Sequence, residues 1–245
     1  MLAIVKKNIK TSLLIFATAA LISCNNQHRH TINGSGNLIT QKREITDDFK
    51  RIEVSSAVEV VIEQADRTEI YVEAEDNLQK SIITKVRNGV LFISRENGNY
   101  SSHKTQKVFI KTPIIVELTA NSASSIKTKN ILKGENISLN ASSAAKIEAQ
   151  LAVDNIKANS SSASKIDIKG MALSLEVDAT SASKIDAEDL LVNAITAQSS
   201  SGSKISIHPI VSLKADASSG GKIEYNNNPK QIEKSTSSGG DISQE

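Results

Sequence analysis

Apolar and polar residues alternate through the C-terminal half of the chain in a pattern that recurs every 18 to 21 residues. In each copy an aliphatic residue precedes a polar one, and a second apolar residue follows in every copy except the last. This period of two residues is typical of a β-strand with one face buried and the other in water, and it excludes a helix. The first aliphatic column consists of Val116, Ile137, Ile156, Leu175, Ile195, Leu213 and Ile232.

A serine-rich segment follows each predicted strand and indicates a sharp bend. In the copy SSASKIDI, from Ser161 to Ile168, the second position is serine, and the same position is serine in all the remaining copies. The third position, here Ala163, is only alanine or glycine, so we expect a close approach of backbone to backbone that leaves no room for a larger side chain. The isoleucine after the bend belongs to a second strand and points inward. These isoleucines are Ile126, Ile147, Ile166, Ile185, Ile205, Ile223 and Ile242.

Two strands and two bends in about 19 residues make one coil of a β-solenoid, in which each strand pairs in parallel with its copy in the next coil. Parallel connections of this kind are overwhelmingly right-handed. The predicted fold class is therefore all-β, a right-handed parallel β-solenoid over residues 116–245. The second bend carries an extra apolar residue, which we expect to fill the far edge of the core. These residues are Leu132, Leu151, Met171, Leu191 and Ile210.

The residues before the repeats predict a different arrangement of strands. Between Ile39 and Lys111 apolar and polar residues alternate over short runs, which is typical of half-buried strands. Asn88-Gly89 indicates a hairpin turn, because both central residues of that turn need a positive φ. We expect residues 36–115 to form an N-terminal β region whose strands and hairpin cover one end of the solenoid. At the other end, Lys234 and Asp241 break the repeat, and charge on a final rung opposes end-to-end stacking.

The first residues predict a targeting segment. Three lysines precede an apolar stretch from Leu13 to Ile22, which is shorter than the ~20 residues that a permanent membrane span needs. We therefore expect a signal peptide over residues 1–23 and a polar tether over residues 24–35. Cys24 is the only cysteine, so an internal disulfide is impossible.

The amino-acid composition indicates what fills the core and excludes one class of binding partner. The chain is 39% hydrophobic but only 3% aromatic, which favours a thin core of aliphatic side chains. Beyond residue 23 it has 26 basic and 27 acidic residues. A near-neutral protein lacks the basic excess that phosphates demand, so we expect no nucleic-acid partner.

A column of lysines is the main candidate for chemistry on the surface. Acids stand two residues after most of these lysines, as Asp167 does after Lys165. One interpretation is an anion-binding strip for an acidic glycan or lipopolysaccharide. The other is a solvated face whose opposite charges pair, each exposed pair contributing ~0.2–1 kcal/mol. The column consists of Lys146, Lys165, Lys184, Lys204 and Lys222.

Catalytic and metal motifs are weak. Parallel β-helix enzymes that cleave polysaccharides use a carboxylate cluster and a groove with aromatic rings, whereas here the acids are spread singly and Tyr225 is the only aromatic residue after position 115. His103 and His208 have no nearby partners in sequence, and two ligands from His28 and His30 on a tether make no closed metal site. We predict a protein that is not an enzyme and that needs no cofactor and no metal.

Two resemblances add to these patterns. The tetrad Leu21-Ile22-Ser23-Cys24 resembles the lipobox of bacterial lipoproteins, which implies cleavage before Cys24 and a lipid on that residue. From about Ile39 onward, the Asn88-Gly89 hairpin and the Ser-Gly/Ala-Ser-Lys-Ile coils resemble the head GIN domain of auto-transporter adhesins, a family frequent in lipoproteins of Bacteroidetes. This resemblance implies a secreted β-solenoid with a binding or adhesive role, and it carries over no active site.

The function that we expect is a lipid-anchored cell-envelope protein whose rigid solenoid presents a surface to a glycan or a protein. We expect the lipid on Cys24 to anchor the protein in the outer membrane. The sequence does not decide between the periplasmic face and the outer face. Two alternatives stand beside it: a polysaccharide-cleaving β-helix enzyme, and an architectural envelope protein without a ligand. The sequence leaves the ligand and the oligomeric state open.

Overall fold

The computed structural model describes residues 31–102 and 104–245. The expected signal peptide, Cys24, His28, His30 and His103 lie outside the described residues. By its internal contacts the chain divides into two compact units, the smaller of which contains Thr31, Ile32 and Gly98–Ser101 among the described residues. In that part β1 (Thr31–Asn33) pairs with β8 (Asn99–Ser101). No helix in the described ranges is long and apolar enough to cross a bilayer.

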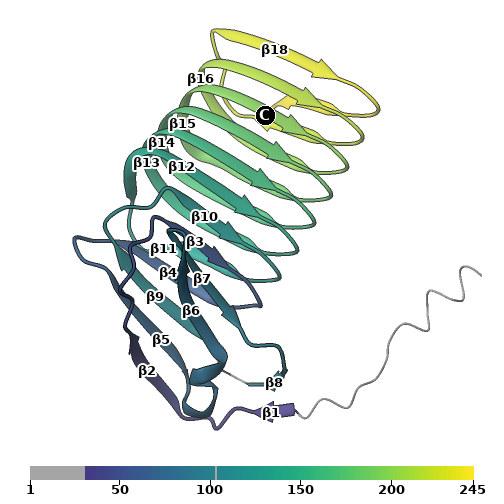
Figure 1. The fold of residues 1–245 in the computed structure, drawn as a ribbon. Coiled ribbons are helices and arrows are strands. Elements are labelled where there is room, and N and C mark those ends of the chain that lie inside the picture. The colour runs from purple at the N-terminus through teal and green to yellow at the C-terminus, as the bar shows by residue number, and fades with distance from the viewer. Residues whose placement is uncertain (1–30, 103) are drawn as a thin grey trace, which may run out of the picture. The chain divides into compact units, whose positions relative to one another are not determined.

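The larger unit confirms the predicted solenoid. Its central coils are built from long strands, and all of these except the first run from the second predicted strand of one copy into the first predicted strand of the next (Figure 1). These strands pair in parallel, and the isoleucine column lies in register from Ile147 through Ile166 and Ile185 to Ile205. They are β12 (Leu132–Ala141), β13 (Lys146–Ser160), β14 (Lys165–Ala179), β15 (Lys184–Ser199) and β16 (Lys204–Ala217).

Shorter strands continue the ladder on both sides of the central coils. On the N-terminal side β10 (Glu117–Ala120) and β11 (Ser125–Thr128) pair with β12 and β13. On the C-terminal side β17 (Lys222–Tyr225) and β18 (Gln231–Thr236) pair with β16, and β19 (Asp241–Gln244) pairs with β17. The predicted inward columns are buried within this stack. Only their ends are open to solvent, at Val116 and Ile232 in the first column and partly at Ile242 in the second.

The parallel ladder reaches beyond the first sequence repeat into the N-terminal region. β3 (Arg51–Val54) and β4 (Glu59–Gln64) pair in parallel with β10 and β11, and they carry the same corner at Ser56 and Ala57. The remaining strands and a short 3-10 helix fold around this coil. They are β2 (Leu38–Arg43), β5 (Glu69–Glu75), η1 (Asp76–Ser81), β6 (Ile82–Arg87), β7 (Val90–Arg95) and β9 (Lys107–Thr112).

Antiparallel pairing sets these N-terminal strands apart. β7 and β9 still pair in parallel with β3 and β4, but β6 pairs antiparallel with β7, β5 with β9, and β2 with β5. The hairpin predicted at Asn88-Gly89 is confirmed, since both residues have positive φ, 51° and 72°. The N-terminal strands and hairpin thus cover the end of the first coils.

The serine corners differ from the expectation in their physical cause. Ser162 and Ala163 both have positive φ, 52° and 59°, and the Ser164 N–H donates to the Ser161 carbonyl at 3.2 Å, as in a type I′ turn. Their side chains are exposed, so the predicted lack of room at Ala163 is wrong. Small residues occur there because bulkier ones rarely adopt a left-handed backbone.

The close backbone approach lies one position later, at the buried corner residue. In the last corners this residue is glycine, and an added Cβ on Gly221 would lie 2.3 Å from the Ser199 carbonyl oxygen. The corners also continue the ladder, because the Ala163 N–H donates to the Ser181 carbonyl of the next coil at 3.0 Å.

The second bend is also different from the expectation. Leu132 and Leu151 are buried as predicted, but Met171, Leu191 and Ile210 are exposed. Leu151 pairs with Gly170, and Gly170 pairs with Leu190, so the inward position lies one residue earlier in those coils. A shift of one residue moves a side chain to the opposite face of a strand, which explains the error.

Candidate binding groove

The predicted lysine column lies on the outward face after the corners, where each lysine meets a carboxylate. Lys165 Nζ lies 2.9 Å from Asp167 Oδ1, and Lys184 Nζ lies 2.9 Å from Asp186 Oδ2. Lys146 pairs with Glu148, and both Lys204 and Lys222 pair with Glu224. The five lysines therefore form a row of ion pairs, not a row of free cations.

Hydrogen bonds to carboxylates favour the charged form of Lys146, Lys184 and Lys222. The hydrogen bond to Glu148 raises the pKa of Lys146, and the same bond lowers the pKa of Glu148. Hydrogen bonds to Asp186 and Glu224 raise the pKa of Lys184 and of Lys222 in the same way. Each lysine of the column thus has a carboxylate partner in its own or the next coil, which weakens the field that a polyanion would meet.

A groove of about 490 Å³ opens on this face across four successive coils. It is lined by residues of β11, β13, β14 and β15. Of its two lysines, Lys127 lies 3.4 Å from Glu148, and Lys169 lies 2.6 Å from Asp189. Acids outnumber these lysines, so the groove presents mainly oxygen acceptors. The acids are Glu148, Asp167, Asp186, Glu188 and Asp189.

A β-bulge shapes the C-terminal part of the groove. The register between β14 and β15 shifts between Asp167 and Gly170, and the register between β15 and β16 shifts between Ala187 and Leu191. Glu188 and Asp189 lie within this irregular stretch. A bulge adds a residue to one strand and redirects the side chains beside it, and here it brings two more carboxylates to the groove.

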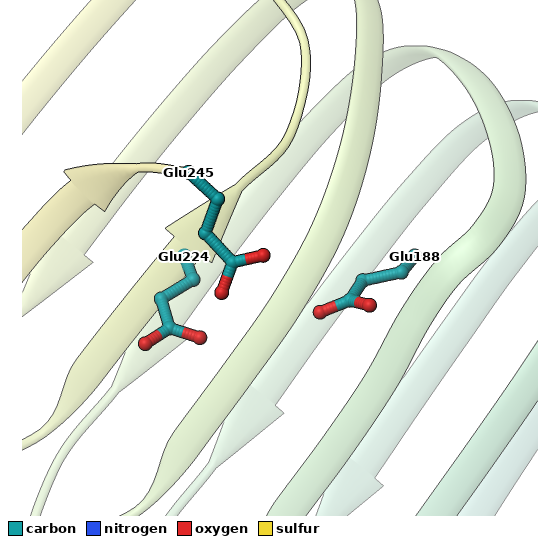
Figure 2. Close-up of side chains that lie close together, drawn as sticks. All are labelled: Glu188, Glu224 and Glu245. Carbon is teal, nitrogen blue, oxygen red and sulfur yellow. The ribbon is translucent and has the colours of Figure 1, made fainter.

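Three carboxylates meet at the C-terminal side of the same face. Glu188 from β15, Glu224 from β17 and Glu245 after β19 each offer a carboxylate oxygen, and these oxygens lie within 4.8 Å of one another (Figure 2). The expectation that the acids stand singly is therefore wrong at this place. Stacking of coils brings together residues that are far apart in the sequence.

The carboxylates of the cluster differ in burial and in the direction of their pKa shifts. Glu224 is buried, and hydrogen bonds from Lys204 and Lys222 lower its pKa to about 2. Glu245 lies against Glu224, and that contact raises the pKa of Glu245. Glu224 is hence an anion at any physiological pH, while its neighbour is more readily protonated. Oxygen donors in such a cluster suit a hard cation.

The spacing of the isoleucines in the sequence carries a signal for this region. The isoleucines Ile185 and Ile205 are 20 residues apart, whereas Ile147, Ile166 and Ile185 follow at steps of 19. The additional residue indicates a bulge between them, where Glu188 and Asp189 stand. Their meeting with Glu224 and Glu245 depends on the coil geometry and had no signal in the sequence.

Comparison with known proteins gives a family and several related folds. A family model described as "Putative auto-transporter adhesin, head GIN domain" matches residues 48–229. A comparison with curated proteins finds no match.

Three solved structures show the same fold. A "putative adhesin" from Bacteroides fragilis is 21% identical, with 87% of this chain and 100% of that chain covered, at a TM-score of 0.80. A "putative adhesin" from Parabacteroides distasonis is 20% identical, with 88% and 100% covered, at a TM-score of 0.73. A "putative lipid binding protein" from the same species is 21% identical, with 88% and 100% covered, at a TM-score of 0.71.

Proposed function

This chain belongs to the head GIN domain family, and on that premise we propose that it is a lipid-anchored adhesin of the cell envelope. It binds a glycan through the acidic groove on the outward face of its coils. The observation that carries the proposal is the groove itself, about 490 Å³ in volume and lined by outward side chains of four successive coils. A solenoid repeats its surface at each coil, which suits a ligand that is itself a repeating polymer.

The lining of the groove favours one class of glycan. Carboxylates accept hydrogen bonds and attract cations but repel anions. Acids exceed lysines in the lining, but the column lysines pair with Glu148, Asp167 and Asp186, and Lys169 pairs with Asp189. Among the described residues Glu188 pairs with no basic side chain, so it can meet an ammonium group. The preferred ligand is therefore a neutral or amine-bearing glycan, whose hydroxyl groups donate to the lone pairs that the ion pairs leave free on Asp167 and Asp186.

A glycan array with the full-length protein tests this proposal. We expect retention of neutral or amine-bearing glycans and a clear loss for the double variant Asp167→Asn with Asp186→Asn. Glu176→Gln is the matched control, because Glu176 is exposed on β14 outside the groove and pairs with Lys157 at 2.8 Å. No retention of such glycans by the wild type, or equal retention by the double variant, would refute the groove as the binding site.

The lysine column provides the contrasting arm of the same experiment. A variant with all five column lysines changed to serine should bind neutral glycans much as the wild type does. If the wild type instead retained acidic glycans and the serine variant lost them, the anion-binding strip would replace the groove in this account.

The lipid anchor rests on Cys24 and the tetrad before it. Cys24→Ala should abolish lipid labelling of the protein and leave an uncleaved precursor, whereas Cys24 in the wild type should carry the lipid after cleavage. Asn26→Ala, two residues further along, is the control and should be processed as the wild type is. A wild-type protein without lipid in the membrane fraction would contradict the anchor.

Contact with lipid is a second candidate function, favoured by exposed aliphatic side chains at the second bend. Met171 and Leu191 lie side by side in the ladder and are 60% and 47% exposed. Leu173, Ile210 and Val211 are exposed on the same and the following coil, and such apolar patches commonly mark interaction sites. Liposome sedimentation tests this: binding that Met171→Ser with Leu191→Ser removes would support it, and absence of binding would exclude it.

A further inference from the structure

We propose that Glu188, Glu224 and Glu245 bind one Ca²⁺ ion, with the hydroxyl of Ser206 beside them as a further oxygen ligand. The inference goes beyond adhesion, because it concerns a metal site that needs no glycan. It also differs from the sequence expectation that the protein needs no metal.

The distances between the carboxylates fit one ion. Ca²⁺ takes oxygen ligands at about 2.3–2.6 Å, so oxygens up to about 4.6–5.2 Å apart can contact the same ion. One oxygen from each of Glu188, Glu224 and Glu245 lies within 4.8 Å of the other two. Figure 2 shows Glu224 and Glu245 side by side, with the carboxylate of Glu188 directed toward them from β15.

Ser206 supplies an independent indication of a ligand. Its side chain is 1% exposed, and its Oγ has no hydrogen-bond partner in the described residues. A buried hydroxyl without a partner is unfavourable, so such groups usually have an ion or a water beside them. Ser206 pairs in register with Glu224 on the next strand. Both side chains lie on the outward face between inward residues, which aims the hydroxyl toward the cluster.

The balance of charges in the cluster also favours a bound cation. Glu224 is balanced by Lys204 and Lys222, but neither Glu188 nor Glu245 forms an ion pair with a basic side chain in residues 31–102 and 104–245. Three carboxylates against two lysines leave a negative excess at one point. Carboxylates and a hydroxyl are the oxygen donors that Ca²⁺ prefers, whereas Mg²⁺ usually keeps several waters and binds few protein carboxylates.

Binding would connect the end of the chain to the coils. Glu188 stands on β15, Glu224 on β17, and Glu245 follows β19 directly. One ion would thus join three coils at the end of the stack, where all six residues of β18 are exposed. A ligand that binds only the folded protein raises its apparent stability with the logarithm of the ligand concentration above the Kd, so the Tm should keep rising as Ca²⁺ is added.

Calorimetric titration of the calcium-free full-length protein with CaCl₂ tests the proposal. We expect one Ca²⁺ per chain and a rise in Tm. Glu188→Gln should weaken binding by roughly tenfold or more, because affinity follows the number of charged ligands. Ser206→Ala should weaken it by a smaller factor. Both variants should keep the circular dichroism spectrum of the wild type.

Glu176→Gln is the control, because it removes one exposed carboxylate from β14, outside the cluster. This variant should bind Ca²⁺ as the wild type does. Glu245→Gln repeats the test of Glu188→Gln at a position after the last strand, where misfolding is not a concern. The proposal is overturned if the wild type gives no heat and no change of Tm with Ca²⁺, if Glu188→Gln and Glu245→Gln bind as tightly as the wild type, or if Mg²⁺ binds as tightly as Ca²⁺.

Discussion

The two ends of the solenoid close the same parallel ladder by different means. At the N-terminal end, antiparallel strands fold over the first coils, and a buried polar contact fixes them: Gln79 Nε2 donates to the carbonyls of Ile39 and Val72 at 2.8 and 3.0 Å. At the C-terminal end, Lys234 Nζ lies 4.5 Å from the centroid of the Tyr225 ring and donates to its hydroxyl at 2.6 Å. One end is covered by additional chain, whereas the other depends on charge.

This difference shows that the residue pattern that stabilises the central coils cannot by itself stabilise the ends of the stack. Within β13 to β16 the inward positions stack on side chains of the same kind, as Ile147, Ile166 and Ile185 do, so one pattern of residues fills the core of every coil. At an end that copy is missing, and open edges invite pairing with other chains. The last coil places a lysine in the aliphatic column, which discourages such pairing but leaves little buried surface. We therefore expect stability to fall from the central coils toward the C-terminal end.

The largest expected effect separates the central coils from the last coil. Ile166→Ala truncates a fully buried side chain and should cost about 2–5 kcal/mol in the free energy of unfolding. Ile242→Ala, at the equivalent position of the last coil, should cost less, because Ile242 is only partly buried. Urea unfolding measures both. Equal losses would contradict the difference between centre and end, and no loss for Ile166→Ala would contradict the inward column.

The next effect concerns the second bend. Gly170 has a φ of +119°, and a Cβ there would lie 2.0 Å from the Leu151 carbonyl oxygen of the previous coil. Gly170→Ala should therefore cost about 1–3 kcal/mol or more, as overpacking against backbone does. Gly134→Ala is the matched control in β12, where an added Cβ meets no atom within 4 Å. If the two variants unfolded at the same urea concentration, the packing described for this bend would be incorrect.

A smaller effect tests the corners, which both regions share. Ala163 and Ala57 have positive φ, 59° and 57°, a conformation that costs a non-glycine residue about 1–2 kcal/mol. Replacement of either by glycine should raise stability by up to about 1 kcal/mol, because glycine has no Cβ to strain the left-handed backbone, while its greater loss of freedom on folding offsets part of that gain. Ala163→Leu should lower stability although the side chain is exposed, because a bulkier residue adopts a left-handed backbone less readily than alanine. Thermal unfolding that showed glycine to be destabilising at both corners would disprove the turn assignment.

The smallest effect belongs to the lysine column. Lys165→Ser removes one ion pair whose lysine side chain is 42% exposed, and such pairs contribute about 0.2–1 kcal/mol. The loss should shrink further at high salt, where screening weakens the pair. Urea midpoints at low and high salt measure it. A loss of several kcal/mol would mean that the column supports the fold in a way that these contacts do not explain.

Much of the fold followed from periodicity, because alternation of residues reports directly which side chains face the core. Ile166 and Ile185 were assigned inward on that ground alone, and Asn88-Gly89 located a hairpin by its need for positive φ. The corner was located correctly but explained wrongly, since a requirement for small residues can arise from backbone conformation as well as from space. The corner at Ser56 and Ala57 was missed because the N-terminal strands separate it from the next copy.

Less of the candidate binding groove and of the carboxylate cluster could be predicted from the sequence. Lys165 and Asp167 are close in the chain, so their pairing could be considered as one of two interpretations. Glu188, Glu224 and Glu245 come from different coils, and only the exact register and a bulge bring them together. Met171 and Leu191 were placed on the wrong face because a shift of one residue cannot be located without coordinates.

Hydrogen exchange of the full-length protein, followed by segment with mass spectrometry, tests the central claim most directly. Amide protection should be highest in β13 to β16, similar in β3 and β4 because they belong to the same parallel ladder, and lowest in β18 and β19. Slow exchange in β18 and β19 equal to that of β14, or rapid exchange of β3 and β4 while the central coils stay protected, would contradict a continuous ladder that is covered at one end and open at the other.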